Sequence, residues 1–90
     1  MSIEEKIKVI NKLGLHLRAA AKLVKVTSQY KCRIKVRNSG AAVDGKSLLN
    51  LMALAASYGS ELTFVIEGDD GQDALTAIQG LFHNKFGERE

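Results

Sequence analysis

The sequence predicts an α+β fold: an open-faced two-layer sandwich in which three helices cover one face of a four-stranded antiparallel sheet. Three segments alternate apolar and polar residues, which is typical of strands with one buried and one solvated face. Three other segments repeat apolar residues at helical spacing. These helices alternate with the strands in the order β-α-β-β-α-β-α, which predicts a single two-layer domain over residues 1–90.

The expected strands are residues 6–11, 32–37, a short edge strand within 41–44, and 61–67. The alternation is cleanest in "CRIKVR", where Cys32, Ile34 and Val36 oppose three basic residues. In "KIKVIN" Ile7 and Val9 share one face, and in "ELTFVIE" the apolar face carries Leu62, Phe64 and Ile66. The basic side chains of 32–37 should therefore lie on the open face of the sheet.

The expected helices are residues 17–29, 47–56 and 71–85. Their buried stripes are predicted to be Ala20, Leu23, Val24 and Thr27 in the first, Leu48, Leu51, Met52 and Ala55 in the second, and Ala74, Leu75, Ile78, Leu81 and Phe82 in the third. Ser47 directly precedes the second helix, where its hydroxyl can cap a free N–H group, an effect of about 1 kcal/mol. Gly87 is the expected stop after the third helix.

The composition indicates a compact chain with a one-sided charge. It has 90 residues, 46% of them hydrophobic, and a net charge of +3. Residues 6–46 contain eleven Lys or Arg but a single acid, Asp44, so we expect an anionic ligand, nucleic acid included, or an acidic protein partner. No apolar run approaches the roughly 20 residues of a membrane span, and no signal-like segment opens the chain. We expect a cytoplasmic protein without membrane insertion, in which the lone Cys32 is a buried strand thiol.

The stretch "GAAVDGKS", residues 40–47, matches the pattern G-x-x-x-x-G-K-[ST] of a phosphate-binding loop. Such a loop needs a parallel sheet and a further strand that supplies an acid for magnesium, and too little chain follows Ser47 to provide them. The residues between the two glycines also fit a short strand better than a phosphate cradle. We therefore interpret the match as accidental and Gly45-Lys46-Ser47 as a helix start.

The stretch "NKLGLHLRAAAKLV", residues 11–24, places a histidine at the entrance of the first helix. A helix entrance presents unpaired N–H groups and partial positive charge, so it binds anions and disfavours the imidazolium form of His16. A neutral imidazole beside an anion site and Arg18 is what a phosphoryl acceptor requires. His83 lies late in its helix, where interaction with the helix C-terminus explains it without a function.

The chain resembles the HPr family, the histidine-containing phosphocarriers of the phosphoenolpyruvate-dependent sugar phosphotransferase system. The resemblance runs from "NKLGLHLRAAAKLV" through "GKSLLNLMALAASYGSELTFVIEGDD" to "AIQGLFHNKFGE". It implies that His16 accepts a phosphoryl group on Nδ1 from Enzyme I and passes it to Enzyme IIA domains, with Arg18 neutralising the phosphate. Such a protein is a phosphoryl-transfer intermediate, without metal or cofactor, and not a stand-alone enzyme; we expect it to be a monomer.

The resemblance also implies a regulatory site at Ser47, phosphorylated by an ATP-dependent HPr kinase/phosphorylase, and signalling to a transcription regulator in members with both sites. A phosphate at a helix N-terminus is locally stabilised, so it should act by repelling an acidic partner. The partner surface should lie between the two helix starts and comprise Leu17, Lys22, Lys46, Leu48, Leu49 and Met52. For Leu48 and Met52, core packing is an equal alternative.

One departure from the family pattern follows the arginine, where proline is usual and this chain has Ala19. Losing the proline costs about 0.4–1 kcal/mol through the unfolded chain, while alanine remains a strong helix former. Partner choice therefore stays open, including a specialised regulatory or nitrogen-type branch. The alternative from another class is a small basic nucleic-acid-binding domain, but the strands lack interleaved aromatics and no G-x-x-G loop occurs.

Overall fold

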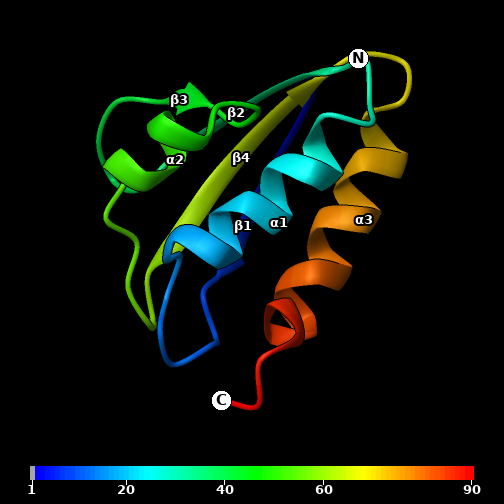
Figure 1. Cartoon of the computed structure of the whole chain (residues 1–90). Helices are drawn as coiled ribbons and strands as arrows, with labels where there is room; N and C mark the ends of the chain where they lie inside the picture. Colours follow the sequence, from blue (N-terminus) through cyan, green and yellow to red (C-terminus); the bar gives the residue numbers. More distant parts are fainter. Residues whose placement is uncertain (1) are drawn as a thin grey trace.

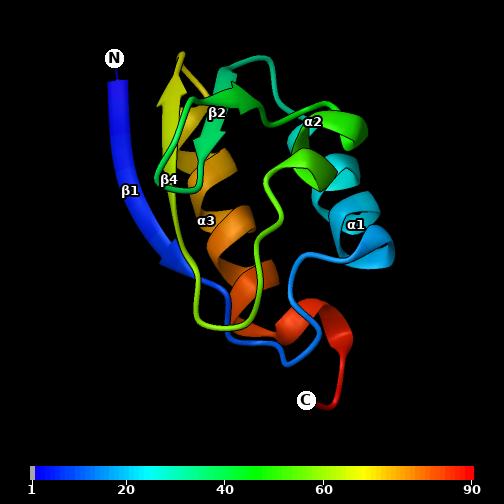
Figure 2. The ribbon, with the colours of Figure 1, turned by 90° about the vertical axis from the view of Figure 1, so that its left-hand side faces the viewer.

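The computed structural model describes residues 2–90 and has the predicted sandwich architecture (Figure 1). The elements are β1 (Ser2–Lys8), α1 (Leu17–Thr27), β2 (Arg33–Arg37), β3 (Val43–Asp44), α2 (Leu48–Ala53), β4 (Glu61–Glu67), α3 (Gly71–His83) and a short 3-10 helix, η1 (Lys85–Gly87). The strands pair antiparallel in the order β1-β4-β2-β3. Figure 2 separates the two layers, with the helices on one side of the sheet. The predicted fold class is confirmed.

The first strand begins and ends earlier than the predicted 6–11. β1 covers Ser2–Lys8 and pairs along its whole length with β4. The charged residues in its first half obscure the alternation, but an edge strand tolerates charge on its solvated face. Beyond Lys8 the chain leaves the ladder after two further bonds, from Val9 N to Ser60 O and from Gly59 N to Val9 O, both 2.8 Å.

The helices are shorter than predicted, and the second differs most. α2 covers Leu48–Ala53, and its only buried residue is Leu51. The predicted burial of Met52 and Ala55 is wrong, because both are exposed and Ala55 has a φ of 51°, outside the helix. α1 and α3 end two residues early, at Thr27 and His83. A helix that contacts its neighbours along one narrow line buries one side chain per turn, so periodicity alone overstates its stripe.

The core lies between the inner face of the sheet and the helices. Phe64 from β4, Phe82 from α3 and Phe86 from η1 are fully buried. The ring centroids of Phe64 and Phe82 are 5.7 Å apart, and those of Phe82 and Phe86 are 4.8 Å apart, both in edge-to-face geometry. This column of rings fastens the C-terminal η1 to the sheet. Cys32 is buried, as predicted.

The open face of the sheet carries charges of both signs. Basic and acidic residues pair across the strands: Lys8 lies opposite Glu61, Arg33 opposite Glu67, and Lys35 opposite Asp44. An ion pair joins Arg37 to Glu4, with Nη2 and Oε2 3.7 Å apart. Acids that lie elsewhere in the sequence are therefore interspersed with the basic residues, so this face is not the uniformly basic surface expected of a nucleic-acid-binding domain.

Asp70 joins the start of α3 to the loop before β2. Its carboxylate accepts hydrogen bonds from the backbone N–H groups of Lys31, at 2.7 Å, and Cys32, at 2.9 Å. The hydrogen bond from Lys31 N–H, supported by those from Cys32, lowers the pKa of the Asp70 carboxyl below its ordinary value and more than offsets the effect of burial.

We expect Asp70→Asn to unfold at a lower urea concentration than the wild type at pH 7. The pKa of Asp70 is lower in the folded chain, so its contribution is complete above the unfolded value of about 4 and is lost as the pH falls through the folded pKa. Urea midpoints at pH 7 and in acid measure the gap, which should shrink in acid. The neighbouring Asp69→Asn is the control, and an equal effect of both substitutions would contradict this role.

Candidate functional site

The segment between β1 and α1 turns sharply at Gly14, and this turn places His16 at the start of α1. Gly14 has a φ of +71°, and a Cβ there would lie 2.7 Å from the carbonyl oxygen of Ala56. Asn11 Nδ2 donates to Gly14 O at 2.8 Å, and Leu15 N donates to Ala56 O at 2.9 Å. Glycine is therefore required at this turn, and the two hydrogen bonds define where the chain enters α1.

His16 is the N-cap residue of α1, as the sequence predicts. Its backbone is extended, with φ −72° and ψ 175°, and its carbonyl accepts the first helical bond from Ala20 N at 2.8 Å. Among residues 2–90 no side chain caps this helix end. The first-turn N–H groups consequently face outward without an internal acceptor, as an anion site requires.

The imidazole of His16 uses one of its two nitrogens. Nε2 contacts Oε2 of Glu88, and the other oxygen of that carboxylate accepts from Asn11 Nδ2 at 3.0 Å. Within residues 2–90 no hydrogen bond engages Nδ1. The His16 side chain is 24% exposed, so this free nitrogen remains accessible from the surface.

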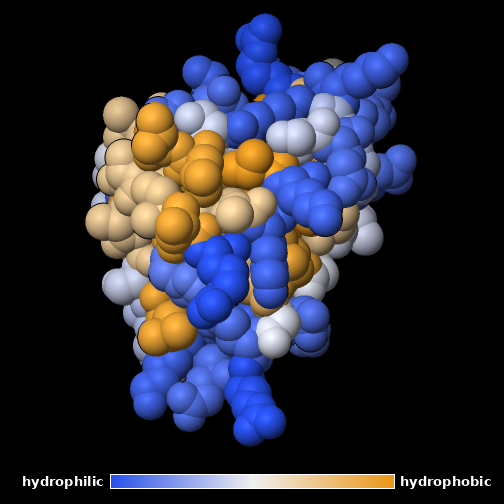
Figure 3. Space-filling view, in the orientation of Figure 1, coloured by the Kyte–Doolittle hydropathy of each residue, from blue (hydrophilic) through white to orange (hydrophobic). Residues whose placement is uncertain are grey.

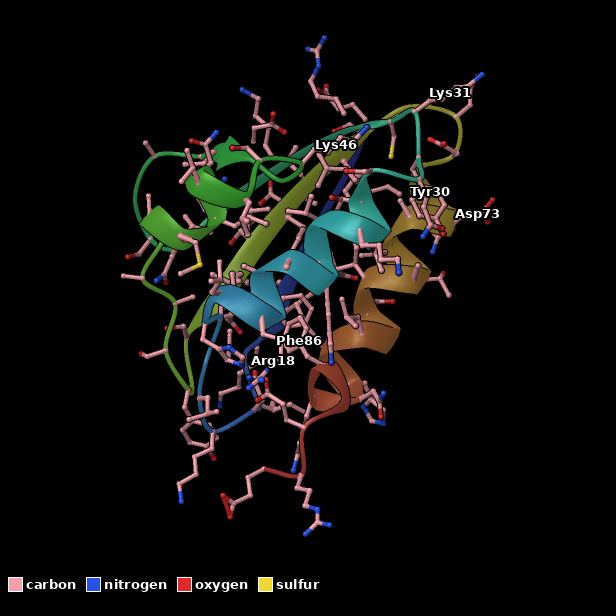
Figure 4. All side chains as sticks on the ribbon, in the orientation of Figure 1. Arg18, Tyr30, Lys31, Lys46, Asp73 and Phe86 are labelled. Carbon is pink, nitrogen blue, oxygen red and sulfur yellow. The ribbon has the colours of Figure 1, made fainter. Side chains whose placement is uncertain are left out.

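Glu88 is held as a carboxylate. Burial raises the pKa of its carboxyl, but the hydrogen bonds from His16 and Asn11, together with the charges of His16 and Arg18, outweigh burial and lower the pKa below its ordinary value. The charge of Arg18, the second residue of α1, is the last of these contributions. Figure 4 places Arg18 at the start of α1, beside the turn that carries Phe86.

Ala19 occupies the position of the family's usual proline without loss of the helix. It is fully buried in the first turn of α1, which begins at Leu17. Alanine has a high helix propensity, so the backbone that frames His16 forms without the preset φ of proline.

Ser47 caps α2, as predicted, with its Oγ accepting from Asn50 N at 3.3 Å.

The contacts of Gly45 and Lys46 argue against a phosphate-binding loop at "GAAVDGKS". A Cβ at Gly45 would lie 2.7 Å from Ile34 Cγ2, so this glycine serves contact with the sheet. Lys46 Nζ donates to Tyr30 O at 2.6 Å, a contact between residues labelled in Figure 4. The lysine that would hold phosphate is thus bonded within the fold.

The predicted partner residues form two groups: apolar side chains, most of them exposed, and lysines that donate hydrogen bonds within the fold. Leu17 is 59% exposed and Leu49 is 82% exposed, and Met52 is also exposed, whereas Leu48 is partly buried. Figure 3 shows apolar atoms gathered on the left of this face, where Figure 1 places α2 and the start of α1. Such an exposed cluster is typical of a protein interface.

The two lysines assigned to the rim of that surface make internal bonds. Lys22 Nζ donates to Phe86 O at 2.6 Å, much as Lys46 donates to Tyr30. Each ammonium retains further N–H donors, so the charge still contributes to the field around the site. Lys22 additionally has a structural task, which the sequence pattern does not indicate.

Asn11 and Glu88 are site residues that sequence reasoning missed. Asn11 is fully buried, and both acceptors around its Nδ2 are oxygens, which assigns the orientation of the amide. Glu88 lies 72 positions after His16. A polar residue that interrupts the apolar pattern in 6–11 was the available signal for Asn11; Glu88 stands in a polar terminal stretch that carries no periodic signal.

Two classes of feature are lacking from the described residues 2–90. No helix in that range is long and apolar enough to cross a membrane. No group of three or more His, Cys, Asp or Glu side chains there is arranged to hold a metal ion.

Comparison with known proteins gives consistent matches over nearly the whole chain. The family described as "PTS HPr component phosphorylation site" matches residues 3–84. The Phosphocarrier protein HPr of Pseudomonas aeruginosa is 48% identical over 85 residues, which are 93% of this chain and 94% of that protein. The crystal structure of HPr-C-His from Thermoanaerobacter tengcongensis superposes with a TM-score of 0.93 at 36% identity, covering 98% of this chain and 99% of that one.

A second solved relative bears on oligomeric state. The crystal structure of an HPr dimer from Thermoanaerobacter tengcongensis is 38% identical, with a TM-score of 0.77 over 91% of this chain and 94% of that one. The dimer is a property of that protein, and a monomer stays our prediction for this chain.

Proposed function

The chain belongs to the HPr family of phosphotransferase-system phosphocarriers, and from that premise we propose that His16 carries the phosphoryl group. Phosphorylated Enzyme I donates the group and Enzyme IIA domains receive it. The observation that supports this assignment is a histidine at a helix start that has no side-chain cap within residues 2–90. Its Nε2 contacts Glu88, whereas its Nδ1 makes no hydrogen bond in that range. Sugar uptake through the phosphotransferase system is the corresponding cellular role.

The transfer needs only groups that lie at this site. The Nδ1 lone pair attacks phosphorus, a new N–P bond forms, and the N–P bond to the Enzyme I histidine breaks with its electron pair returning to that ring. The phosphoryl oxygens meet the N–H groups of the first turn of α1 and the charge of Arg18, which stabilise developing negative charge. Incubation with phosphoenolpyruvate and Enzyme I should attach one acid-labile phosphoryl group; an unlabelled protein would contradict the proposal.

The partner surface in this proposal is the exposed apolar cluster of Leu17, Leu49 and Met52 with a basic surround that includes Lys22 and Lys46. Leu17 lies in the first turn of α1, and Lys46 and Leu49 lie at the start of α2, whereas Lys22 and Met52 lie further along these helices. Apolar contact provides the buried centre of the interface, and the lysines favour fast encounter with acidic surfaces of Enzyme I and Enzyme IIA.

Ser47 is the proposed site of regulatory phosphorylation by an HPr kinase/phosphorylase, with a transcription regulator as a further partner of the modified protein. Its hydroxyl stands at the N-terminus of α2, where a phosphate would be locally stabilised by the helix. The added negative charge lies beside the partner surface and should slow transfer by repelling acidic partners.

We expect exposure to ATP and a cognate HPr kinase to add one acid-stable phosphate, and Ser47→Ala to remain unlabelled. Mass spectrometry of the intact protein before and after acid treatment measures the difference. Ser47→Ala also loses the cap, so its stability should fall by about 1 kcal/mol while the fold is retained. Ser28→Ala at the end of α1 is the control. Labelling that persists in Ser47→Ala but disappears in Ser28→Ala would reject this site.

A further inference from the structure

Resting on the proposed function, we propose that Glu88 is a positioning residue for phosphoryl transfer: it holds the proton of His16 on Nε2, aims Nδ1 outward, and balances the charge of the phosphorylated ring. The juxtaposition that carries this inference is the carboxylate of Glu88 between Nε2 of His16 and Nδ2 of Asn11. Each oxygen of the carboxylate has its own donor.

The direction of these hydrogen bonds follows from the chemistry of the groups. An ionised carboxylate can only accept, and the lowered pKa of Glu88 keeps it ionised near neutral pH. The contact with Nε2 therefore requires a proton on Nε2. In a neutral imidazole with its proton on Nε2, the lone pair is on Nδ1, which is the nitrogen that no group within residues 2–90 engages.

Glu88 is held in place by the segment that carries it. Phe86 is buried against Phe82, and its carbonyl accepts from Lys22 Nζ at 2.6 Å. Phe86 and Gly87 both have positive φ, 55° and 80°, and this turn directs the chain back toward His16. The N–H of Glu88 itself donates to Lys85 O at 2.9 Å. The carboxylate is thus presented by an anchored turn.

The bound carboxylate also has a role after transfer. When Nδ1 bonds to phosphorus, the proton stays on Nε2 and the ring becomes a cation. Glu88 remains hydrogen bonded to that N–H and provides the counter-charge, while the phosphoryl group is attached to the other nitrogen. Delivery to Enzyme IIA breaks the N–P bond with its electron pair returning to Nδ1, which restores the neutral ring without movement of the Nε2 proton.

The test compares Glu88→Gln with Glu90→Gln, a control in the same terminal segment whose carboxylate makes only an exposed ion pair with Lys12 at 3.8 Å. Rates of phosphoryl acceptance from Enzyme I are measured by rapid quench. We expect a loss of about tenfold in Glu88→Gln, by analogy with the lower end of the losses caused by removing partners of metal-ligating histidines, and no change in Glu90→Gln.

A second measurement responds to charge and not to structure alone. Hydrolysis of the phosphohistidine depends on the proton on Nε2, which the carboxylate stabilises. Phosphohistidine hydrolysis slows as the pH rises. In Glu88→Gln this decrease should therefore occur at a pH about one unit lower than in the wild type, the smallest shift expected when an adjacent opposite charge is lost.

The imidazole ¹⁵N spectrum provides a separate test on the unphosphorylated protein. The spectrum of the wild type should show the proton on Nε2, and the spectrum of Glu88→Gln should show a mixture of tautomers.

The outcomes separate this inference from the function on which it rests. A wild-type chain that Enzyme I does not label contradicts the phosphocarrier function. A labelled wild type with unchanged rate and pH profile in Glu88→Gln overturns the role of Glu88 alone. A wild-type ring with its proton on Nδ1 overturns it too, independently of any variant.

Discussion

His16→Ala should lose the acid-labile phosphoryl label completely when incubated with phosphoenolpyruvate and Enzyme I. The substitution removes the imidazole at the start of α1, whose Nδ1 takes part in no hydrogen bond within residues 2–90. Arg18 and the helix N–H groups can stabilise a bound phosphoryl group, but they cannot replace the lone pair that forms the bond. The loss is therefore one of chemistry and not of affinity.

The matched control is His83→Ala, which removes the exposed histidine at the end of α3. Intact-mass spectrometry before and after acid treatment follows both variants, and far-ultraviolet circular dichroism verifies that each is folded. His83→Ala should be labelled like the wild type. An acid-labile label that survives in His16→Ala would refute the assignment of His16.

Phe82→Ala should cost about 3–5 kcal/mol of stability, as expected for truncating a buried aromatic residue. Phe82 is the middle ring of the column that joins β4, α3 and η1, and it contacts both Phe64 and Phe86 edge to face. Domains of this size have a total stability of about 5–15 kcal/mol, so the variant should be partly unfolded near body temperature.

Urea unfolding monitored by circular dichroism measures this effect, with Leu49→Ala as the control. Leu49 is 82% exposed, so its truncation should alter stability by no more than about 0.5 kcal/mol. The milder Phe82→Leu retains part of the buried volume and should lie between the two. A Phe82→Ala midpoint equal to that of Leu49→Ala would show that the ring column does not stabilise the fold.

The elements that could be predicted from the sequence are those in which the spacing of apolar residues matches the burial of each residue. Alternation in residues 32–37 identified the central β2 because both faces of that strand keep one environment along its length. The bounds of β1 and α2 were less predictable. In the edge strand β1, charged residues are tolerated on the solvated face, so they obscure the alternation of the strand. In α2, only a narrow side of the helix packs against the rest of the domain, so Met52 is exposed although its spacing fits the predicted apolar stripe.

By itself, the sequence determined the order of the elements, the place of His16 at a helix entrance and the cap at Ser47, because each follows from neighbouring residues and local hydrogen bonding. The tertiary structure alone decided that Glu88 and Asn11 meet, 77 positions apart, at His16. It also decided that acidic residues lie opposite basic residues on the sheet. Contacts between distant turns and the register between strands depend on how the layers close, and no periodicity along the chain encodes them.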